Sequence, residues 1–378
     1  MWTRYTMNDV SPRVLILWAN AHSANLGVRA LAQGSAELVR QVWPDAAITF
    51  QDLGPNEEGF RVSMQLVKAD IGRPQGPIKR WLRSFDLVVD TGAGDSFADI
   101  YGRNRLGRII YTQLTASSLG LPVVLGPQTI GPFDGFLSRL VARFALSKAS
   151  STFARDSASL DYAKSLGARR LLPSTDVVFG LQIPDAGPAR DVLLNVSGLL
   201  WQENSHVDAS RYQESVRSLI TQLDASGRRV SLLAHVIDNP TKDNDLIAMR
   251  ELEGEFGDRV KSVVPNSLDE VRSALRGANI VIGSRMHACL NALSVGTPAI
   301  PWAYSRKFAP LLRDLGWPIS IDLKTEQRPQ EQTLALVARD ASTWDAYLAA
   351  LREAADDRLS NVTDALRALG STLVREGV

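Results

Sequence analysis

The sequence is poor in the residues that build disulfide frameworks and metal sites. Of its 378 residues one is cysteine, Cys289, and four are histidine. A single cysteine excludes an intrachain disulfide and a cysteine-rich zinc site. No two of the histidines have the spacing of zinc ligands. We therefore expect no metal site, and we expect Cys289 to lie in the core.

The chain also lacks an excess of either charge and lacks a long apolar segment. Lys and Arg number 42 and Asp and Glu number 41, which leaves a net charge of +1. This balance gives no reason to expect nucleic acid as a partner. No run approaches the roughly 18 apolar residues of a membrane span, and residues 1–13 lack the apolar core of a signal peptide. We expect a cytoplasmic protein. Peripheral membrane contact and the oligomeric state stay open.

What the chain does contain is a regular alternation of apolar and amphipathic segments. Short runs of β-branched residues, such as 14–18 and 279–282, are followed by a polar loop and then by apolar residues at helical spacing. This alternation predicts an α/β fold with two doubly wound, Rossmann-like domains in a GT-B-like architecture. In such domains ligands bind at the carboxyl ends of the strands.

The division between the domains is expected at a polar segment that contains proline and glycine, residues 182–190. We predict an N-terminal domain over residues 1–182 and a C-terminal domain over residues 190–320. The pattern of residues 321–378 is largely helical, and we expect these helices to pack back on the N-terminal domain. Residues 54–80, rich in Gly, Pro and charge, predict a flexible crossover with one helical segment.

Residues 278–298 form the most informative stretch of the sequence. A short buried strand ends at Gly283, and a helix with Ser284 as its expected N-cap follows. Arg285 and His287 then fall in the first helical turn, where free backbone N–H groups and the positive end of the helix dipole gather. This arrangement suits an anion with a proton donor beside it. The alternative is that both side chains only cap or solvate the helix end.

Other polar side chains follow several of the predicted strands, where a ligand is expected. Each of these residue types also has a structural explanation. An aspartate can cap a turn, Arg155 can form an ion pair with Asp156 or Asp176, and a histidine can be a structural residue of a loop. The candidate residues at these strand ends are Asn25, Gly27, Asp95, Gln128, Arg155 and His235.

Taken together, these segments resemble the polysaccharide pyruvyltransferase family from about residue 13 to residue 318. The chain departs from the family pattern at Val28, where the family often has aspartate, and at Ala93, where a glycine is expected. The resemblance rests on Asn25-Leu26-Gly27, Thr91-Gly92-Ala93-Gly94-Asp95, the GPQTIGP segment 126–132, Ala154-Arg155-Asp156, Asp176 and Ser284-Arg285-Met286-His287.

The resemblance implies transfer of a pyruvyl group from phosphoenolpyruvate onto two hydroxyls of a sugar, with formation of a cyclic ketal and release of phosphate. The sugar would belong to a glycan or glycolipid precursor, and phosphoenolpyruvate would be a co-substrate rather than a cofactor. In this interpretation His287 is the general acid and Arg285 holds phosphate or carboxylate. Donor binding would further use Ser284, His235 and Arg306 on the C-terminal domain and Arg155 on the N-terminal domain. The acceptor site on the N-terminal domain would use Asn25, Gly27, Asp95 and Gln128.

Two other functions are compatible with the sequence. A GT-B glycosyltransferase that uses a nucleotide sugar would need a ribose-binding carboxylate near residues 305–307, where Arg306 and Lys307 suit an anion instead. A non-catalytic, ligand-binding homologue is compatible with Val28, but the complete Ser284-Arg285-Met286-His287 motif argues against it. Whether the acceptor is lipid-linked or polymeric stays open.

Overall fold

The structure is a computed structural model that describes residues 11–54, 59–237, 243–305, 307–340 and 342–373. These residues divide into two compact units. The first takes in the chain up to Ala21, Leu31–Gly180 and the chain from Ala355, and the second takes in His22–Ala30 and Leu181–Ala354. The units differ from the sequence-based boundaries in two respects, the first of which is that residues 321–378 are divided between the units at Ala355. The other is that residues 22–30 cluster with the second unit although they precede most of the first.

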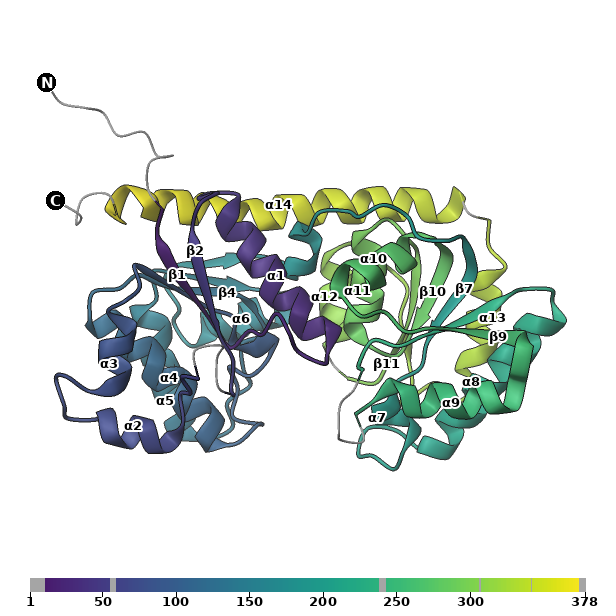
Figure 1. The fold of residues 1–378 in the computed structure, drawn as a ribbon, viewed down its shortest axis with the longest axis horizontal. Helices are drawn as coiled ribbons and strands as arrows, with labels where there is room; N and C mark the ends of the chain where they lie inside the picture. Colours follow the sequence, from purple (N-terminus) through teal and green to yellow (C-terminus); the bar gives the residue numbers. More distant parts are fainter. Residues whose placement is uncertain (1–10, 55–58, 238–242, 306, 341, 374–378) are drawn as a thin grey trace, which may run out of the picture. The chain divides into compact units, whose positions relative to one another are not determined.

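The first unit is built on a parallel six-stranded sheet with the strand order β2-β1-β3-β4-β5-β6. Figure 1 labels β1, β2 and β4 of this sheet. The strands are β1 (Arg13–Leu17), β2 (Ala47–Gln51), β3 (Leu87–Asp90), β4 (Val123–Gln128), β5 (Ser151–Ala154) and β6 (Leu171–Pro173). The helices are α1 (Leu26–Arg40), α2 (Met64–Asp70), α3 (Pro77–Leu82), α4 (Arg103–Ser118), α5 (Phe136–Lys148) and α6 (Ser157–Ser165), with the short 3-10 helices η2 (Gly92–Gly94) and η3 (Val177–Gly180).

The central strands of this sheet are apolar on both faces because helices cover both faces. Every residue of β3 and β4 is buried. On one face, Leu15, Val88 and Leu125 share a core with Ile109 of α4 and Leu146 of α5. Helices α2, α3, α4 and α5 pack beside one another in this unit. The buried strand ends hold the polar loops that follow them in fixed positions.

The prediction of one helical segment in residues 54–80 is wrong, because the structure has two helices there, α2 and α3. The buried carboxylate of Asp70 organises the second. Its Oδ1 accepts hydrogen bonds from the backbone N–H groups of Ile78 (2.8 Å) and Lys79 (3.3 Å), at the start of α3. Its Oδ2 accepts hydrogen bonds from Lys79 Nζ and Tyr111 Oη. These contacts join residues far apart in sequence, so no local pattern announces them.

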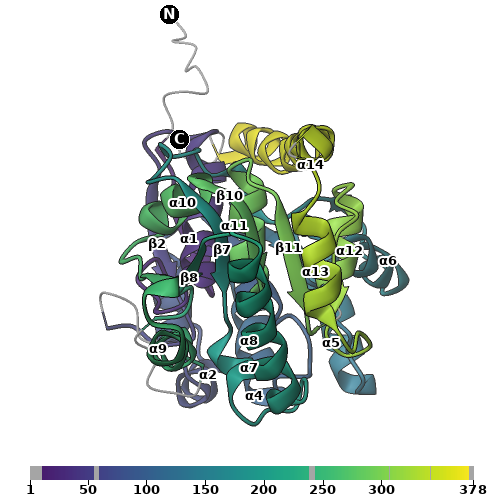
Figure 2. The ribbon, with the colours of Figure 1, turned by 90° about the vertical axis from the view of Figure 1, so that its right-hand side faces the viewer.

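The second unit is built on another parallel six-stranded sheet, with the order β12-β11-β10-β7-β8-β9. The strands are β7 (Arg190–Asn195), β8 (Val230–Leu233), β9 (Val260–Val263), β10 (Ala278–Gly283), β11 (Ala299–Ala303) and β12 (Ile321–Asp322). The helices are α7 (Gly198–Trp201), α8 (Ala209–Ala225), α9 (Asp245–Phe256), α10 (Leu268–Arg276), α11 (Met286–Ser294), α12 (Phe308–Asp314) and α13 (Pro329–Val337), with the 3-10 helix η4 (Gly257–Arg259). In Figure 2, α8 and α13 lie side by side over this sheet.

The last helix, α14 (Ser342–Leu373), contributes to both units, which divide it at Ala355. Residues 321–378 were expected to be helical. They begin instead with the short strand β12, which pairs with β11. The two doubly wound parallel sheets confirm the predicted fold class. Each sheet has a topological switch point, on the two sides of which the chain adds strands in opposite directions. It lies between β1 and β3 in the first unit and between β7 and β10 in the second. Ligands of doubly wound sheets bind at such points.

Candidate functional site

The candidate site of the second unit lies where the chain order reverses, between β7 and β10. These strands pair in parallel and end level with one another, with Gly283 opposite Asn195. Beyond them, the Asn195 carbonyl accepts a hydrogen bond from Ser284 N (3.2 Å), and its side-chain Oδ1 accepts one from Arg285 N (3.0 Å). The end of β7 therefore fixes the backbone from which α11 starts.

A buried carboxylate, Asp245 at the first residue of α9, joins the loops of this site. It accepts hydrogen bonds from the backbone N–H groups of Gly198 (2.9 Å), His235 (3.0 Å) and Val236 (3.0 Å). It also accepts bonds from Asn195 Nδ2 (3.2 Å) and from the Arg285 guanidinium. Asp245 thus ties the loops after β7, β8 and β10 together. Asp245 is not among the residues predicted from the sequence. The only local feature that marks it is its position directly after the N-cap Asn244.

Arg285 is the N-cap residue of α11, and its guanidinium faces two carboxylates. Its Nη2 lies 2.7 Å from Asp245 Oδ1 and 2.5 Å from Asp243 Oδ1. Burial disfavours the charge, but the two carboxylates outweigh burial and raise the pKa of Arg285. The Asp245 side chain is fully buried, whereas that of Asp243 is 33% exposed. Arg285 is therefore held in a largely buried ion-pair network with one edge near solvent.

Ser284 does not cap α11 as predicted, because another residue holds its hydroxyl. Ser284 Oγ accepts a hydrogen bond from Tyr212 Oη (2.8 Å), and the same Tyr212 oxygen accepts one from Ser197 N (3.0 Å). The helix starts one residue later than expected, with Arg285 as N-cap. Ser284 is buried, so the structure gives it a place in the floor of the site rather than an exposed one.

His287, the second residue of α11, is half-buried, and the start of α1 packs against its ring. A Cβ added at Gly27 would lie 2.8 Å from Cγ and Nδ1 of His287, so only glycine fits there. Asn25 Oδ1 accepts a hydrogen bond from Gly27 N (2.8 Å) at the start of α1. Asn25 pairs with Val236 in an antiparallel bridge. Asn25 and Gly27, predicted as acceptor residues of the N-terminal domain, thus belong to the second unit beside His287.

His235 lies in the interior of this unit rather than on a surface that a ligand can reach. It is 1% exposed, and burial, with the nearby His287 as a second cause, lowers its pKa to about 3. Asn291 connects the two histidines: its Nδ2 donates to the His287 carbonyl oxygen (2.7 Å) and lies 3.4 Å from His235 Nε2. This burial does not support the predicted contact between His235 and the donor. His235 lies beneath His287 and can act as a positioning residue for it.

Residues 304–308 provide further polar groups of this unit. Tyr304 is half-buried and shares a hydrogen bond with Arg285; burial raises its pKa. Lys307, which precedes α12, is half-buried as well, and burial lowers its pKa to about 8. The predicted donor residue Arg306 lies outside the described residues. Of the two neighbouring cations Arg306 and Lys307, the structure thus describes Lys307, which fits the expected anion site.

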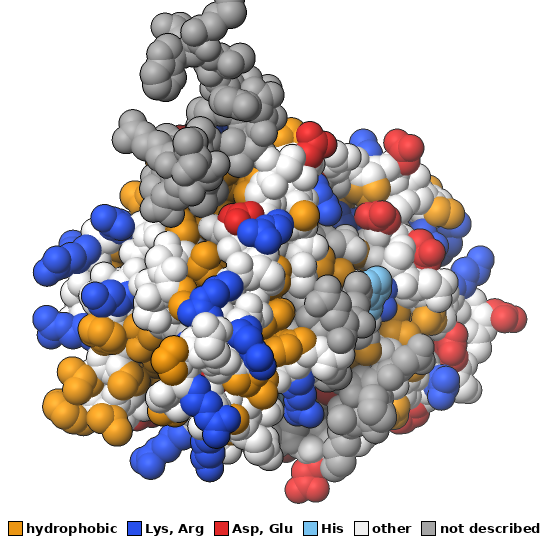
Figure 3. Space-filling view, turned by 60° about the vertical axis from the view of Figure 1, so that its left-hand side comes forward, with side chains coloured by type: hydrophobic (Ala, Val, Ile, Leu, Met, Phe, Trp, Pro, Cys, Tyr) orange, Lys and Arg blue, Asp and Glu red, His pale blue; other side chains and the backbone are white. Residues whose placement is uncertain are grey.

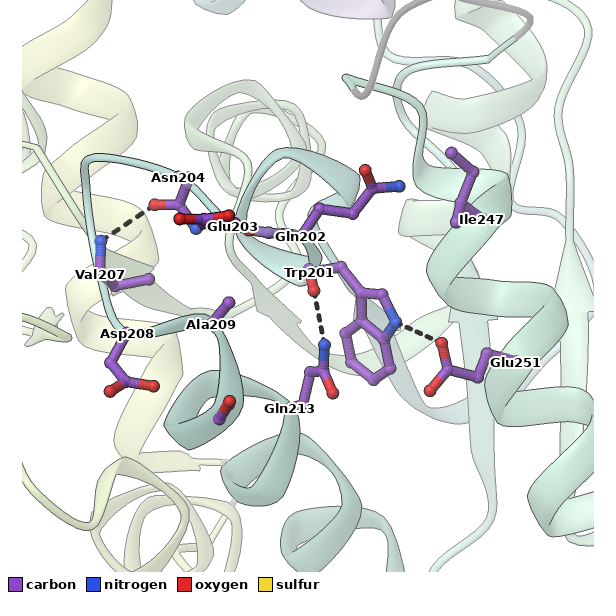
Figure 4. Close-up of a pocket in the computed structure, with 11 residues that line it drawn as sticks. Trp201, Gln202, Glu203, Asn204, Val207, Asp208, Ala209, Gln213, Ile247 and Glu251 are labelled. Atoms are coloured by element: carbon purple, nitrogen blue, oxygen red, sulfur yellow. Dashed lines mark hydrogen bonds between the residues drawn. The ribbon is translucent and has the colours of Figure 1, made fainter.

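A separate cavity of about 580 Å³ lies beside α7 in the second unit. Figure 4 shows Trp201 between Gln213, which donates to its carbonyl oxygen (2.6 Å), and Glu251, which accepts from its Nε1 (2.8 Å). Trp201 is only 2% exposed. It therefore offers no open aromatic face for stacking on a sugar. Polar and apolar groups line the cavity to about the same extent, with Gln202 and Glu203 among its residues.

The remaining predicted residues gather in the first unit, at the ends of β4 and β5 and in the loop after β3. Arg155 is 2% exposed; its Nη1 lies 3.1 Å from Asp176 Oδ2, and its Nη2 donates to Thr129 Oγ1 (2.7 Å). Gln128 is fully buried and donates to the Asp90 carbonyl oxygen (3.0 Å). The sequence left open whether Arg155 pairs with Asp156 or with Asp176, and the structure shows the ion pair with Asp176.

Asp95 is the most accessible of the predicted residues in the first unit. Its carboxylate accepts a hydrogen bond from Tyr101 Oη (2.6 Å). At the end of β3, just before this loop, burial raises the pKa of Asp90 to about 6, although hydrogen bonds from Gly92 N and Trp18 Nε1 favour its charged form. Half-buried Asp95 therefore keeps the exposure that an acceptor contact requires, whereas Arg155 and Gln128 do not.

The described residues were expected to contain neither a metal site nor a membrane-spanning segment. Among the described residues, no three His, Cys, Asp or Glu side chains come together closely enough to hold a metal ion. Over the same part of the chain, no helix combines the length and hydrophobicity needed to cross a membrane. Cys289 is buried and donates to the Gly283 carbonyl oxygen, as its predicted core position requires.

Solved structures of other proteins have folds similar to that of this chain. UDP-GlcNAc 2-epimerase from Neisseria meningitidis, bound to UDP-GlcNAc, superposes with a TM-score of 0.57 at 10% identity, over 94% of this chain and 99% of that one. HepE from Anabaena, in complex with UDP and glucose, superposes with a TM-score of 0.52 at 13% identity, over 96% and 99%. At these identities the likeness concerns the fold alone, which is GT-B-like.

Sequence comparison identifies the family. The amylovoran biosynthesis protein AmsJ of Erwinia amylovora is 24% identical over an alignment of 260 residues that covers 63% of this chain and 61% of AmsJ. The match thus spans about three fifths of the length of that relative. The sequence profile of the family described as polysaccharide pyruvyl transferase matches residues 25–306, from the Asn25 loop to the end of the second-unit site. Because this match takes in well over half of the chain, the chain belongs to the polysaccharide pyruvyl transferase family.

Proposed function

We propose that this protein transfers a pyruvyl group from phosphoenolpyruvate onto two hydroxyls of a sugar in a glycan or glycolipid precursor, forming a cyclic ketal. The observation that carries the proposal is the position of His287. It stands in the first turn of α11, at the reversal point of the second sheet, with the backbone of Gly27 against its ring. Family membership supports the proposal independently.

The proposed reaction needs a proton donor near neutral pH, and His287 is placed to serve as one. A proton passes from the imidazolium to the methylene carbon of phosphoenolpyruvate, which makes C2 electrophilic. One sugar hydroxyl attacks C2 and loses its proton, and the C2–O bond to phosphate breaks. The second hydroxyl then adds to C2, which closes the ketal ring, and it also loses its proton. Of the two hydroxyl protons, one restores the imidazolium and the other leaves with the phosphate. Nothing in these steps requires a cofactor other than the co-substrate.

The donor carries a phosphate and a carboxylate, and we propose that cations at the start of α11 and α12 bind them. Lys307, with Arg306 before it, supplies one set of charges. Arg285 supplies the other once a donor anion takes the place of Asp243, the more exposed of its two carboxylates. Asp245 keeps Arg285 oriented throughout. Among the predicted acceptor residues, Asn25 is half-buried and lies in the same unit as His287, and we propose that it meets an acceptor hydroxyl.

The test is phosphate release by His287→Ala, with phosphoenolpyruvate and a panel of sugar acceptors. We expect turnover to fall about 10²–10⁴-fold, the usual contribution of a general acid, while donor binding by calorimetry stays within about twofold. His22→Ala is the matched control, because His22 is exposed and lies in the same unit. Near-normal turnover of His287→Ala would contradict the assignment.

Thermal unfolding with phosphoenolpyruvate, UDP and GDP tests the donor itself. A ligand present at about 100 times its Kd stabilises the folded chain by roughly 2.7 kcal/mol. We expect this stabilisation with phosphoenolpyruvate and none with either nucleotide. Stabilisation by a nucleotide alone would instead indicate a glycosyltransferase with a nucleotide-sugar donor.

A further inference from the structure

Helix α5 of the first unit is apolar on the side that faces solvent. Its core side consists of Ala142, Ala145 and Leu146, which are buried. On the other side four large apolar side chains stand in the open, three of them at intervals of four residues. Their exposed fractions are 79% for Phe136, 69% for Leu137, 51% for Leu140 and 52% for Phe144. We call these four residues the α5 surface.

Exposure of this kind costs free energy in water unless another surface covers it. Large side chains exposed singly are normal, but four on one helix form a stripe. Ile100 (51%) and Tyr101 (40%) extend the apolar character, since the neighbouring Asp99 accepts hydrogen bonds from the backbone N–H groups of Asp134 and Gly135, at the start of α5. Figure 3 shows hydrophobic side chains gathered at the lower left of this face, with basic side chains around them.

The charged side chains on helix α5 and on its neighbour α4 are all basic, and the nearby acidic residues, Asp99 and Asp134, lie at the start of α5. Helices α4 and α5 pack against each other, and their sequences, residues 103–118 and 136–148, contain no Asp or Glu. They contain six basic residues in a chain whose net charge is only +1: Arg103, Arg105, Arg108, Arg139, Arg143 and Lys148. Lys148 stands over the Phe144 ring, 5.5 Å from its centroid, so charge and apolar surface are adjacent.

We propose that the α5 surface docks on a membrane surface that carries anionic lipid headgroups. An interfacial helix with apolar side chains on its outer face and Lys or Arg beside them binds in this way: the apolar side chains enter the headgroup boundary and the basic groups meet the phosphates. Long basic side chains reach the headgroups while their stems cover apolar surface. The inference does not depend on the proposed reaction.

Charge also argues against a second copy of this chain as the occupant. A two-fold symmetric contact through the α5 surface would set the same patch against itself. Arg143 and Lys148 would then meet their own counterparts at an interface that has no acidic residue on either helix. Like charges brought together in this way destabilise a contact, whereas anionic headgroups are attracted.

The test is sedimentation of the full chain with vesicles of phosphatidylcholine, alone or mixed with phosphatidylglycerol. We expect binding to the mixed vesicles that weakens as salt rises. The double variant Phe136→Ser, Phe144→Ser should bind at least about tenfold more weakly. Removing two charges with Arg143→Gln and Lys148→Gln should weaken binding about fivefold for each charge. The matched control, Ile183→Ser with Val264→Ser, replaces exposed apolar residues of the second unit and should bind like the unchanged chain.

Equal binding to both kinds of vesicle, or binding that the α5 variants leave unchanged, would overturn the proposal. Self-association without lipid that the Phe136→Ser, Phe144→Ser variant abolishes would also overturn it, in favour of a second copy. The readout is separate from the proposed function, because phosphoenolpyruvate binding and turnover on a soluble acceptor should be the same in all these variants.

Discussion

Each unit has a buried arginine just after a strand, and the two arginines differ in the number and the exposure of their carboxylate partners. In the first unit, Arg155 faces a single carboxylate, Asp176, and the two side chains are 2% and 1% exposed. In the second unit, Arg285 faces two carboxylates, the buried Asp245 and Asp243, which is 33% exposed. The first pair is closed to solvent. The second network has a buried half that fixes geometry and an outer half within reach of a ligand.

This difference separates a closed ion pair from a partly open network. The Arg155 pair and its Thr129 contact lock the loops after β4 and β5. The Arg285 network does the same through Asp245, and it also includes Asp243, a carboxylate that is partly exposed. Two arginines that have the same local pattern in the sequence, a strand followed by a polar turn, thus differ because of partners that lie far away along the chain.

The largest expected effect compares the two networks directly. Asp176→Ala leaves Arg155 buried without a counter-charge, and we expect the free energy of unfolding to fall by about 3–5 kcal/mol. Asp243→Ala leaves Arg285 with Asp245, and we expect a loss of no more than about 1 kcal/mol. Urea unfolding of both variants measures the difference. Equal losses would show that the second network is as closed as the first.

The next effect concerns the contact that only the second unit has, between Gly27 and the His287 ring. Gly27→Ala would place a Cβ within 2.8 Å of that ring and displace it. We expect turnover to fall about a hundredfold, the scale for misplacing a catalytic group by about 1 Å. The matched control is Gly254→Ala in α9, where a Cβ meets nothing within 4 Å. That variant should keep normal turnover and gain up to about 1 kcal/mol of stability.

The smallest effect uses pH to compare the buried titratable groups of the two units. His235 has a pKa near 3 when folded and an ordinary pKa of 6.5, so the unfolded chain binds its proton first as pH falls. Stability should therefore drop by about 2 kcal/mol between pH 6.5 and pH 5. Asp90 acts with the opposite sign: its pKa rises from 3.8 to about 6 on folding, so its contribution falls as pH rises through that window.

The measurement is the difference in unfolding free energy between the unchanged chain and His235→Gln at pH 5 and pH 6.5. Asp90 is present in both proteins and cancels. We expect the difference to shrink by about 2 kcal/mol at the lower pH. A difference that does not change with pH would mean that His235 is not buried in its neutral form.

The fold was predictable because its signals are local. Buried parallel strands such as β10 are apolar runs, and the helices between them repeat at helical spacing. The position of Arg285 and His287 at the start of α11 follows from the same signals. Ser284 was assigned wrongly as N-cap because Tyr212, 72 residues away, holds its hydroxyl.

The parts of the site that were not predictable depend on long-range pairing. Asp245 meets Asn195 and Arg285 across 50 and 40 residues of chain, and nothing near Asp245 in the sequence indicates a hub of hydrogen bonds. Gly27 reaches His287 because Asn25 pairs with Val236. A register between segments so far apart is a property of the folded chain, and no spacing rule applies to it.

The division of α14 between the units has a consequence for how the protein is made. The first unit needs the far end of this helix: Arg358 Nη1 donates to the Ser174 carbonyl oxygen (3.2 Å), Asn361 Nδ2 donates to that of Pro173 (3.0 Å), and Leu359 packs against Gly180. During synthesis the ribosome therefore releases every segment of the second unit before it releases the last segment of the first. The unit that starts the chain is the last to be completed, and until then its unfinished surface depends on the nascent chain's surroundings for protection.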